Sequence, residues 1–186
     1  MEYFELVDAE GNPIGMTKER SAVHRDGDLH GGSHIWVIGA KETDGSFPIL
    51  LQKRRADKDS FPGCLDVSCA GHLEAGETFL STAIREMKEE LNLDVQEKDL
   101  IYLFKKQLSG NYRFHGKPFL NREVNFVYLL APSFPLDAMH FQEEEIEELI
   151  WKNSTELNKE LLAGNDAYCI DYWELEELIR HVERMP

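Results

Sequence analysis

The sequence has few cysteines, and it lacks a long apolar run and a secretion signal. Its three cysteines, Cys64, Cys69 and Cys169, form neither a CxxC pair nor an even framework, which argues against disulfides and a thiolate zinc site. No apolar stretch approaches the roughly 20 residues that a membrane-spanning helix needs. The opening residues, MEYFELVDAE, lack the basic and apolar segments of a secretion signal. We therefore expect a cytoplasmic protein without a membrane partner.

Basic residues are also scarce, with 20 against 35 acidic residues and a formal net charge of −15. A field of this sign repels polyanions, which disfavours DNA and RNA polymers as partners. It suits a divalent cation, and such an ion can carry a small phosphorylated substrate into an acidic site. With 186 residues and no repeat or shift in composition, the chain is expected to form one domain, 1–186. The sequence leaves both a monomer and a homodimer open.

Strand and helix signals alternate along the chain. Turn residues between 2–8 and 13–18 predict an N-terminal β-hairpin. Apolar, β-rich runs predict further strands at 34–40, 48–54, 65–71, 100–108, 122–131 and 149–152, with a polar loop at 132–148. Helical patterns lie at 79–91, 154–164 and 171–185. This interleaving predicts an α/β fold, a sandwich built on a mixed sheet.

The helix predicted at 79–91 carries acidic residues opposite its apolar stripe. The stripe consists of Leu80, Ile84, Met87 and Leu91, with Thr78 placed as N-cap and Asn92 at the far end. Glu86, Glu89 and Glu90 gather through spacings of three and four, which on most helices is a solvated face. Here the like charges repel one another, carboxylate oxygens suit Mg²⁺ or Mn²⁺, and a glycine-containing loop precedes the helix. We interpret the cluster as a cation site.

The stretch from Gly71 to Leu93 also resembles a named motif, the Nudix box. That motif is glycine, five residues, glutamate, seven residues, and then Arg-Glu-apolar-x-Glu-Glu-x-Gly-apolar. The matching positions are Gly71, Glu77, Arg85, Glu86, Met87, Glu89, Glu90 and Leu93. Asn92 replaces the last glycine, and asparagine is the next best residue in a left-handed helix end. The resemblance implies a Nudix fold, an α/β/α sandwich around a mixed β-sheet.

The resemblance implies an activity as well, the hydrolysis of a nucleoside diphosphate linked to another moiety, or a close relative of that reaction. Glu86, Glu89 and Glu90 would hold one to three Mg²⁺ or Mn²⁺ ions, with the Gly71 carbonyl as a further ligand. Glu86 is the first choice for the group that accepts the proton of the attacking water. Arg85, paired with Glu77, would orient the helix.

Outside the box the chain resembles the Nudix branch that contains type 1 isopentenyl-diphosphate isomerase and its hydrolase relatives. This resemblance rests on HRDGDLH, LQKRRADKDSFPGCLDVSCAGH, NREVNF and CIDYWELEE. In the isomerase, three histidines and two carboxylates bind a metal ion. His24, His30, His72 and Glu123 fall at or near four of these places, and Asn121 replaces the first carboxylate.

Cysteine placement separates the hydrolase from the isomerase. The isomerase carries its catalytic thiol immediately before the Gly-His dipeptide, where this chain has Ala70. Cys69 lies one residue earlier, and neighbouring side chains of a strand point to opposite faces. We therefore predict that Cys69 is a buried residue of the core that has no part in the reaction.

Substrate contacts are predicted from the most basic run, QKRRADK, and from the C-terminal helix. Arg55, with Arg54 and Lys58, is expected against the diphosphate, although a strand end of this kind is equally often solvated. Trp173 falls at the place of an aromatic residue that lines the isomerase pocket, although such a Trp often only packs. His34 opens a predicted strand and belongs to no motif.

Three functions follow from these residues. The leading one is a metal-dependent pyrophosphohydrolase of a small diphosphate compound, and the alternative is an enzyme like isopentenyl-diphosphate isomerase. A catalytically silent nucleotide-binding module is disfavoured, because it has no need to keep three mutually repelling glutamates. Nucleotides, nucleotide sugars and prenyl diphosphates all remain open as substrates.

Overall fold

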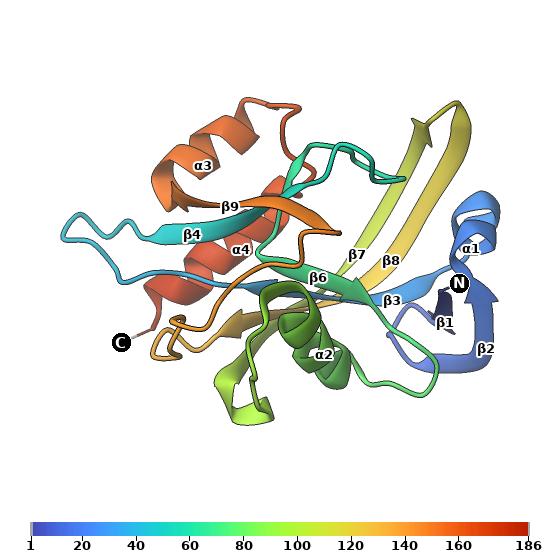
Figure 1. Cartoon of the computed structure of the whole chain (residues 1–186), viewed down its shortest axis with the longest axis horizontal. Coiled ribbons are helices and arrows are strands. Elements are labelled where there is room, and N and C mark those ends of the chain that lie inside the picture. Colours follow the sequence, from blue (N-terminus) through green and yellow to red (C-terminus); the bar gives the residue numbers. More distant parts are fainter. Residues whose placement is uncertain (1, 186) are drawn as a thin grey trace.

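The computed structural model describes residues 2–185 and arranges their strands in two sheets (Figure 1). The larger sheet has the order β2-β1-β3-β8-β7, with β6 added antiparallel to β3. Its strands are β1 (Tyr3–Val7), β2 (Pro13–Glu19), β3 (His30–Trp36), β6 (Cys69–His72), β7 (Leu100–Phe114) and β8 (Lys117–Leu130). The smaller sheet contains β5 (Leu65–Asp66), β4 (Pro48–Arg54) and β9 (Ile146–Asn153), in that order.

Helices cover both faces of the larger sheet. They are α1 (Arg20–Asp26), α2 (Phe79–Leu91), α3 (Ser154–Leu162) and α4 (Tyr172–Glu183), with a 3₁₀ turn at Glu97–Asp99. Within the described part of the chain, no helix has both the length and the apolar character needed to cross a membrane.

Two neighbouring residues of β3 show why the sheet lies between helices. Ile35 packs with Met87 and Leu91 of α2, whereas Trp36 packs with Leu175 of α4 on the opposite face. Because β3 pairs in parallel with β8 and antiparallel with β6, the sheet is mixed. The α/β/α sandwich around a mixed sheet is confirmed.

Helix α2 begins and ends where the sequence predicts. The Thr78 side chain accepts a hydrogen bond from the Ser81 N–H, which satisfies one free donor of the first turn. At the other end, Asn92 takes the left-handed conformation with φ 54°, the geometry that the family's glycine would provide. The acidic residues between these caps therefore have a fixed orientation toward β6.

The region before β3 differs from the prediction. A short helix, α1, lies at Arg20–Asp26, and β3 starts at His30, four residues earlier than expected. Gly31 and Gly32 hid this strand, because glycine weakens a β pattern. Both are glycines for steric reasons: a Cβ on Gly31 would meet Leu73 and Phe79, and one on Gly32 would overlap the Asn125 side chain.

Strands β7 and β8 are also longer than predicted and form an extended hairpin (Figure 1, yellow). The segment SGNYRFHGKPF, residues 109–119, lies between the two predicted strands and is the outer part of this hairpin. Its turn is His115–Gly116, with φ 49° and 78°, as a tight two-residue hairpin turn requires. The hairpin forms one wall of the cavity described below.

Candidate active site

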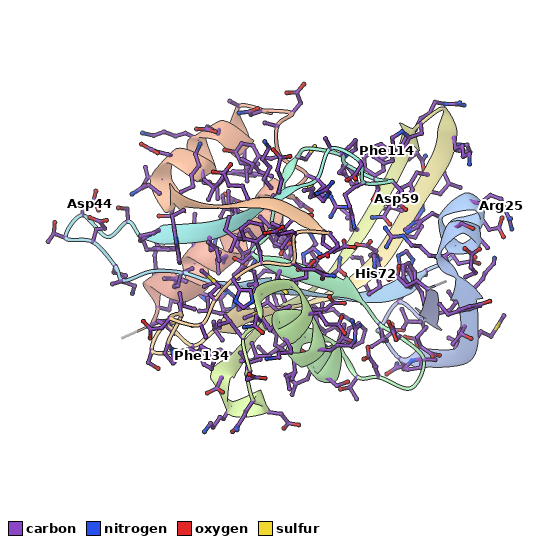
Figure 2. The ribbon with its side chains drawn as sticks, viewed as in Figure 1. Arg25, Asp44, Asp59, His72, Phe114 and Phe134 are labelled. Atoms are coloured by element: carbon purple, nitrogen blue, oxygen red, sulfur yellow. The ribbon has the colours of Figure 1, made fainter. Side chains whose placement is uncertain are left out.

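A cavity of about 640 Å³ lies between the C-terminal part of α2, strand β6, the β7–β8 hairpin and the segment before α4. Its lining brings together most of the predicted site residues: His24, Arg54, Lys58, Gly71, His72, Arg85, Glu86, Glu89, Glu90 and Glu123. His72 lies on the sheet between α2 and the hairpin (Figure 2). Residues that are far apart in the sequence, from His24 to Glu123, thus line one cavity.

The acidic end of the cavity is built on Gly71. A Cβ at this position would overlap the Glu86 carboxylate, so the absence of a side chain is what admits Glu86. One turn later Glu90 is buried, and its Oε2 accepts a hydrogen bond of 3.1 Å from the Ala70 N–H. Glu89 stays at the rim with 53% of its side chain exposed.

Both inner glutamates resist ionisation in the protein alone. Burial, followed by the neighbouring Glu90, raises the pKa of Glu86 to about 8. Burial likewise raises the pKa of Glu90 to about 7. Two adjacent carboxylates that are each hard to charge form a set of oxygen ligands for which a divalent cation is the natural counter-charge. The donor set therefore fits Mg²⁺ or Mn²⁺.

Arg85 connects this acidic cluster to its surroundings. Its guanidinium donates to Glu77 at 2.8 and 3.1 Å and to Glu86 at 2.6 Å, and it reaches Glu89 at 3.0 Å. A further hydrogen bond of 3.1 Å goes to the backbone carbonyl of His72. The pairing of Arg85 with Glu77 agrees with the prediction, and it locks α2 against the end of β6.

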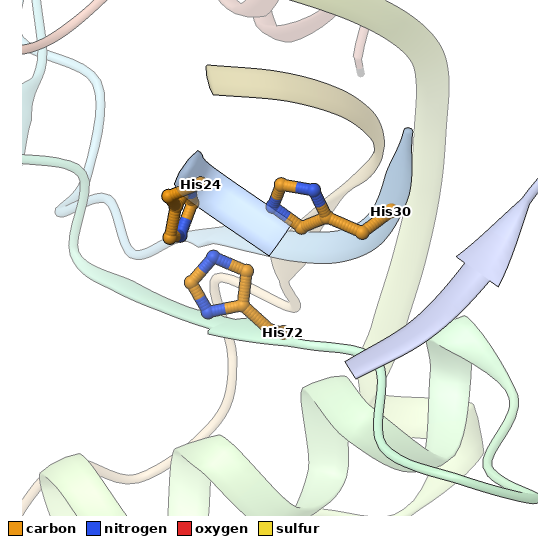
Figure 3. Close-up of side chains that lie close together, drawn as sticks. All are labelled: His24, His30 and His72. Atoms are coloured by element: carbon orange, nitrogen blue, oxygen red, sulfur yellow. The ribbon is translucent and has the colours of Figure 1, made fainter. Parts of the chain in front are cut away.

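Three histidines form a second cluster on the neighbouring part of the sheet (Figure 3). His24 comes from α1, His30 from β3 and His72 from β6, and one ring nitrogen of each lies within 4.8 Å of the other two. The Nε2 atoms of His30 and His72 lie 3.6 and 3.4 Å from one Glu123 oxygen. The sequence predicted no helix or strand at His24 and His30, but the structure puts both on regular elements.

The histidine cluster also fits a cation. Both ring nitrogens of His24 and the Nε2 of His30 are buried without a hydrogen-bond partner among residues 2–185. Buried nitrogens of this kind normally have a ligand. Burial lowers the pKa of His72, and it lowers that of His24 to about 3, so both rings are neutral, the form that binds metal. Asn121, which replaces the first carboxylate of the isomerase pattern, is also buried, and its Oδ1 has no hydrogen-bond partner among residues 2–185.

Cys69 and Ala70 lie on opposite faces of β6, as predicted. Cys69 is fully buried and packs with Ala83 and Met87 of α2. Burial and the nearby Glu90 raise the pKa of its thiol well above the ordinary value, so the thiol stays protonated. Ala70 instead lines the cavity.

Two predicted substrate contacts lie outside the cavity. Arg55 is 42% exposed and donates to Asp57 and to the Glu143 carbonyl, because it follows the last residue of β4 and turns toward solvent. Trp173 is 43% exposed and packs its ring against Phe104. Of the basic residues predicted, Arg54 and Lys58 do line the cavity.

The structure adds residues that sequence reasoning missed. Arg20 lines the cavity at the start of α1, bridged to Glu2 and Asp59. Phe61 and Tyr112 also line it, in edge-on contact with ring centroids 4.8 Å apart. The Phe61 ring also meets Phe114 of the hairpin, so the 55–64 loop contacts the hairpin, and both contribute side chains to the cavity lining. The contacts of Phe61 with the aromatic residues of the hairpin join segments about 50 residues apart, so they left no local signal in the sequence.

Comparison with known proteins identifies the chain's family. The NUDIX domain model matches residues 30–173, which is well over half of the sequence. This chain belongs to the Nudix family. Enzymes of the family generally require a divalent cation.

The relatives of this Nudix chain include hydrolases and isomerases. Nudix hydrolase 3 of Arabidopsis thaliana is 35% identical over 96% of this chain, but the chain spans only 23% of that protein. An uncharacterized Nudix hydrolase of Clostridium acetobutylicum is 32% identical over 80% of this chain and 68% of its own length. Isopentenyl-diphosphate Delta-isomerase of Saccharopolyspora erythraea is 26% identical over 98% of this chain and 87% of its own length. The branch that the sequence resembles is thereby confirmed.

A solved structure supports the fold of the Nudix chain. The crystal structure of DR0079 from Deinococcus radiodurans superposes with a TM-score of 0.64, covering 98% of this chain and 100% of that one. At 23% sequence identity this likeness concerns the fold.

Proposed function

We propose that this Nudix chain hydrolyses a small diphosphate compound with Mg²⁺ or Mn²⁺ bound at Glu86, Glu89 and Glu90. The observation that carries the proposal is the pair of buried carboxylates at Gly71, with pKa values raised to about 8 and about 7. The cavity beside them also holds Arg54 and Lys58, which can bind phosphate oxygens. A divalent cation compensates the charge of the paired glutamates and lets an anionic substrate occupy the same cavity.

The residues divide the work of hydrolysis among them. A divalent cation at this site supplies charge that neutralises the diphosphate and makes water more acidic. Glu86 faces the space at Gly71 and is the group that accepts a proton from the attacking water. Arg85 holds Glu86 at 2.6 Å and keeps it oriented. Arg54, held by Asp66 at 3.3 Å and by the Ser60 carbonyl, presents its charge to the phosphate end.

The histidine cluster is part of the same proposal. We infer that His24, His30, His72 and Glu123 hold a further cation, for which the unpartnered nitrogens of His24 and His30 provide the support. The Nδ1 of His30 lies 3.0 Å from the Asp28 carbonyl, which can only accept. A hydrogen bond from Nδ1 to this carbonyl would leave Nε2, which lies on the side of Glu123, as the nitrogen that binds the cation.

A panel of diphosphate compounds tests this function. Nucleoside di- and triphosphates, nucleotide sugars and prenyl diphosphates would each be assayed with Mg²⁺ and with Mn²⁺ for release of phosphate and pyrophosphate. The proposal expects cation-dependent release from at least one class. No release from any class with either ion would reject it.

An isomerase of isoprenoid diphosphates is the second candidate, and the intact histidine cluster with Glu123 favours it. The thiol that such an enzyme needs is replaced by Ala70, and Cys69 is sealed beneath α2. Interconversion of isopentenyl and dimethylallyl diphosphate, followed by NMR, decides between the two functions. The hydrolase proposal expects none.

A further inference from the structure

His34 occupies a place in the cavity that neither the hydrolase motif nor the histidine cluster explains. It stands on β3 opposite Ala70 of β6, four residues beyond His30, and its side chain is 16% exposed into the cavity. Ala70 faces it across the strand pair, and Gly32 precedes it on the same face, where the Asn125 side chain fills the space above the glycine. His34 is therefore a basic side chain on the cavity floor, next to Ala70 and Asn125.

A buried carboxylate orients the His34 ring. Its Nδ1 lies 2.9 and 3.1 Å from the two oxygens of Glu174, which is 1% exposed. The same carboxylate accepts from Trp36 Nε1 at 3.0 Å and pairs with Lys106 at 2.5 Å. An ionised carboxylate only accepts, so the ring proton nearest to it is on Nδ1. The opposite nitrogen, Nε2, makes no hydrogen bond to residues 2–185 and is not among the buried unpartnered atoms.

The charges around His34 favour its protonated form. Burial alone would lower the pKa of His34, but the Glu174 carboxylate outweighs it and raises the pKa above the ordinary 6.5. The charged groups that act on it are Glu174 from α4, Lys106 from β7 and Glu123 from β8. Asp171, the N-cap of α4, lies 3.6 Å from Lys106. Glu174 itself remains ionised, because His34 and Lys106 overcome its burial and bring its pKa to about 2. The ring thus offers a cationic N–H to whatever enters the cavity.

His34 lies between the acidic cluster and the histidine cluster, and this position indicates its ligand. On one side, the N–H of Ala70 binds Glu90. On the other, Gly32 pairs with His72, whose ring belongs to the histidine cluster. A diphosphate that binds cations at both clusters would lie over Ala70. The His34 ring stands next to Ala70, and its Nε2 is free to contact such a ligand. Phosphate oxygens, like carboxylates, are ionised acceptors, and a cationic N–H binds such acceptors more strongly than neutral ones.

We propose that His34, oriented by Glu174, binds the substrate by donating its Nε2–H to a phosphate oxygen. This inference rests on the proposed function, since it assumes that a diphosphate occupies the cavity. It adds a substrate-contacting residue and a positioning residue, Glu174, from outside the Nudix box. The competing explanation is that His34 only helps to anchor α4 through Glu174, and it predicts no response of His34 to ligand.

The test measures binding of inorganic diphosphate to the Mg²⁺-loaded protein and its effect on the His34 ring. The ring signals would be assigned by comparing histidine NMR spectra of the wild type and His34→Asn. We expect diphosphate to shift the His34 signals and raise its pKa further. At pH 6.5 the dissociation constant should be about tenfold or more weaker in His34→Asn, and the ratio should shrink at higher pH as the wild-type ring loses its proton.

Two further variants separate contact from architecture. Glu174→Gln keeps the size of the orienting group but removes its charge, so the pH at which wild-type-like binding is lost should move downward. His181→Asn, on the same helix but outside the cavity, is the matched control and should bind diphosphate as the wild type does. Melting temperatures of all variants establish that they are folded.

The outcomes distinguish the two proposals. If the wild type hydrolyses a diphosphate compound, yet the His34 signals and the binding constant of His34→Asn are unchanged, the inference fails and the proposed function stands. If the wild type neither binds inorganic diphosphate nor hydrolyses any member of the panel, the proposed function fails, and the inference fails with it.

Discussion

At the scale of single residues, Gly71 leaves the space that the Glu86 carboxylate occupies. Its missing side chain is filled by the Glu86 carboxylate, and its neighbour Ala70 fixes Glu90 through the backbone. The overlap that a methyl group would cause involves the carboxylate and the Cγ of Glu86 and no backbone atom, so this side chain is the group that would have to move. A substitution at Gly71 is therefore expected to affect the proposed activity and the stability to different extents.

Gly71→Ala should therefore reduce activity far more than stability. Displacing Glu86 would remove the proposed cation ligand and proton acceptor, so turnover should fall by about a hundredfold, equivalent to nearly 3 kcal/mol of transition-state stabilisation. The free energy of unfolding should change by only about 1 kcal/mol. Steady-state kinetics and urea unfolding measure both quantities. Turnover equal to the wild type would show that Glu86 need not occupy this space.

At Cys69 we expect the opposite result, a loss of stability with little change in turnover. Cys69→Ala removes a fully buried sulfur that packs under α2, so it should cost about 1 kcal/mol of stability. Turnover should stay within a fewfold of the wild type. A thiol reagent should label Cys69 slowly in the native protein, because the thiol is buried and its pKa is raised. Rapid labelling, or loss of activity in the variant, would contradict the assignment of Cys69 to the core.

Residue identities were predictable where a fixed spacing carries them. The Nudix box gave the contacts of Arg85 with Glu77, because both ends of that interaction lie within one local motif. The exposure of Arg55 was not predictable, since a one-residue choice between Arg54 and Arg55 depends on how β4 ends. The partnership of His34 with Glu174 spans 140 residues and has no sequence signal.

At the scale of elements, α4 is held to the sheet by a buried charge network. Glu174 joins this helix to Lys106 of β7 and to His34 and Trp36 of β3. Removing one partner of a buried ion pair typically costs about 3 kcal/mol or more, because the other charge is left without compensation. We expect Glu174→Gln to lower the free energy of unfolding by an amount of this order.

The stabilisation from this network should depend on pH at both ends. The folded pKa of Glu174 is about 2, below its ordinary 4.5, so its contribution is present above about pH 4.5 and is lost as the pH falls toward 2. The folded pKa of His34 is raised above 6.5, so its contribution is complete below that pH and is lost as the pH rises through the folded value. Chemical unfolding of wild type and Glu174→Gln should differ most between pH 4.5 and 6.5. A difference that is constant from pH 2 to 9 would place the energetic role of Glu174 elsewhere.

Element boundaries were predicted well where caps or clear periodicity mark them. Helix α2 was expected at its observed bounds because Thr78 and Asn92 define its ends. Helix α1 was missed, since seven residues carry too little periodicity and its N-cap, Glu19, makes no side-chain capping bond. The outer part of the β7–β8 hairpin was also missed, because pairing between strands rather than local propensity stabilises it.

At the scale of the whole molecule, the net charge is −15, and we expect a bound cation to stabilise the folded protein. Glu86 and Glu90 repel each other in the protein alone, and a bound cation relieves this repulsion. At about 100 times its dissociation constant, a cation that binds only the folded state adds roughly 2.7 kcal/mol. Mg²⁺ should therefore raise the melting temperature at constant ionic strength, and Glu90→Gln should lose most of that increase. Equal shifts in both proteins would mean that the main ion binds at another place.

The most direct measurement of the central claim is the turnover of the wild type and Glu90→Gln on the best compound of the diphosphate panel. Glu90→Gln keeps the shape of the side chain and its acceptor for the Ala70 N–H, but removes the charge that holds a cation. The account predicts Mg²⁺- or Mn²⁺-dependent release of phosphate or pyrophosphate by the wild type, and a loss of at least about a hundredfold in the variant. Equal turnover in the two proteins, or turnover that persists in a metal chelator, would contradict it.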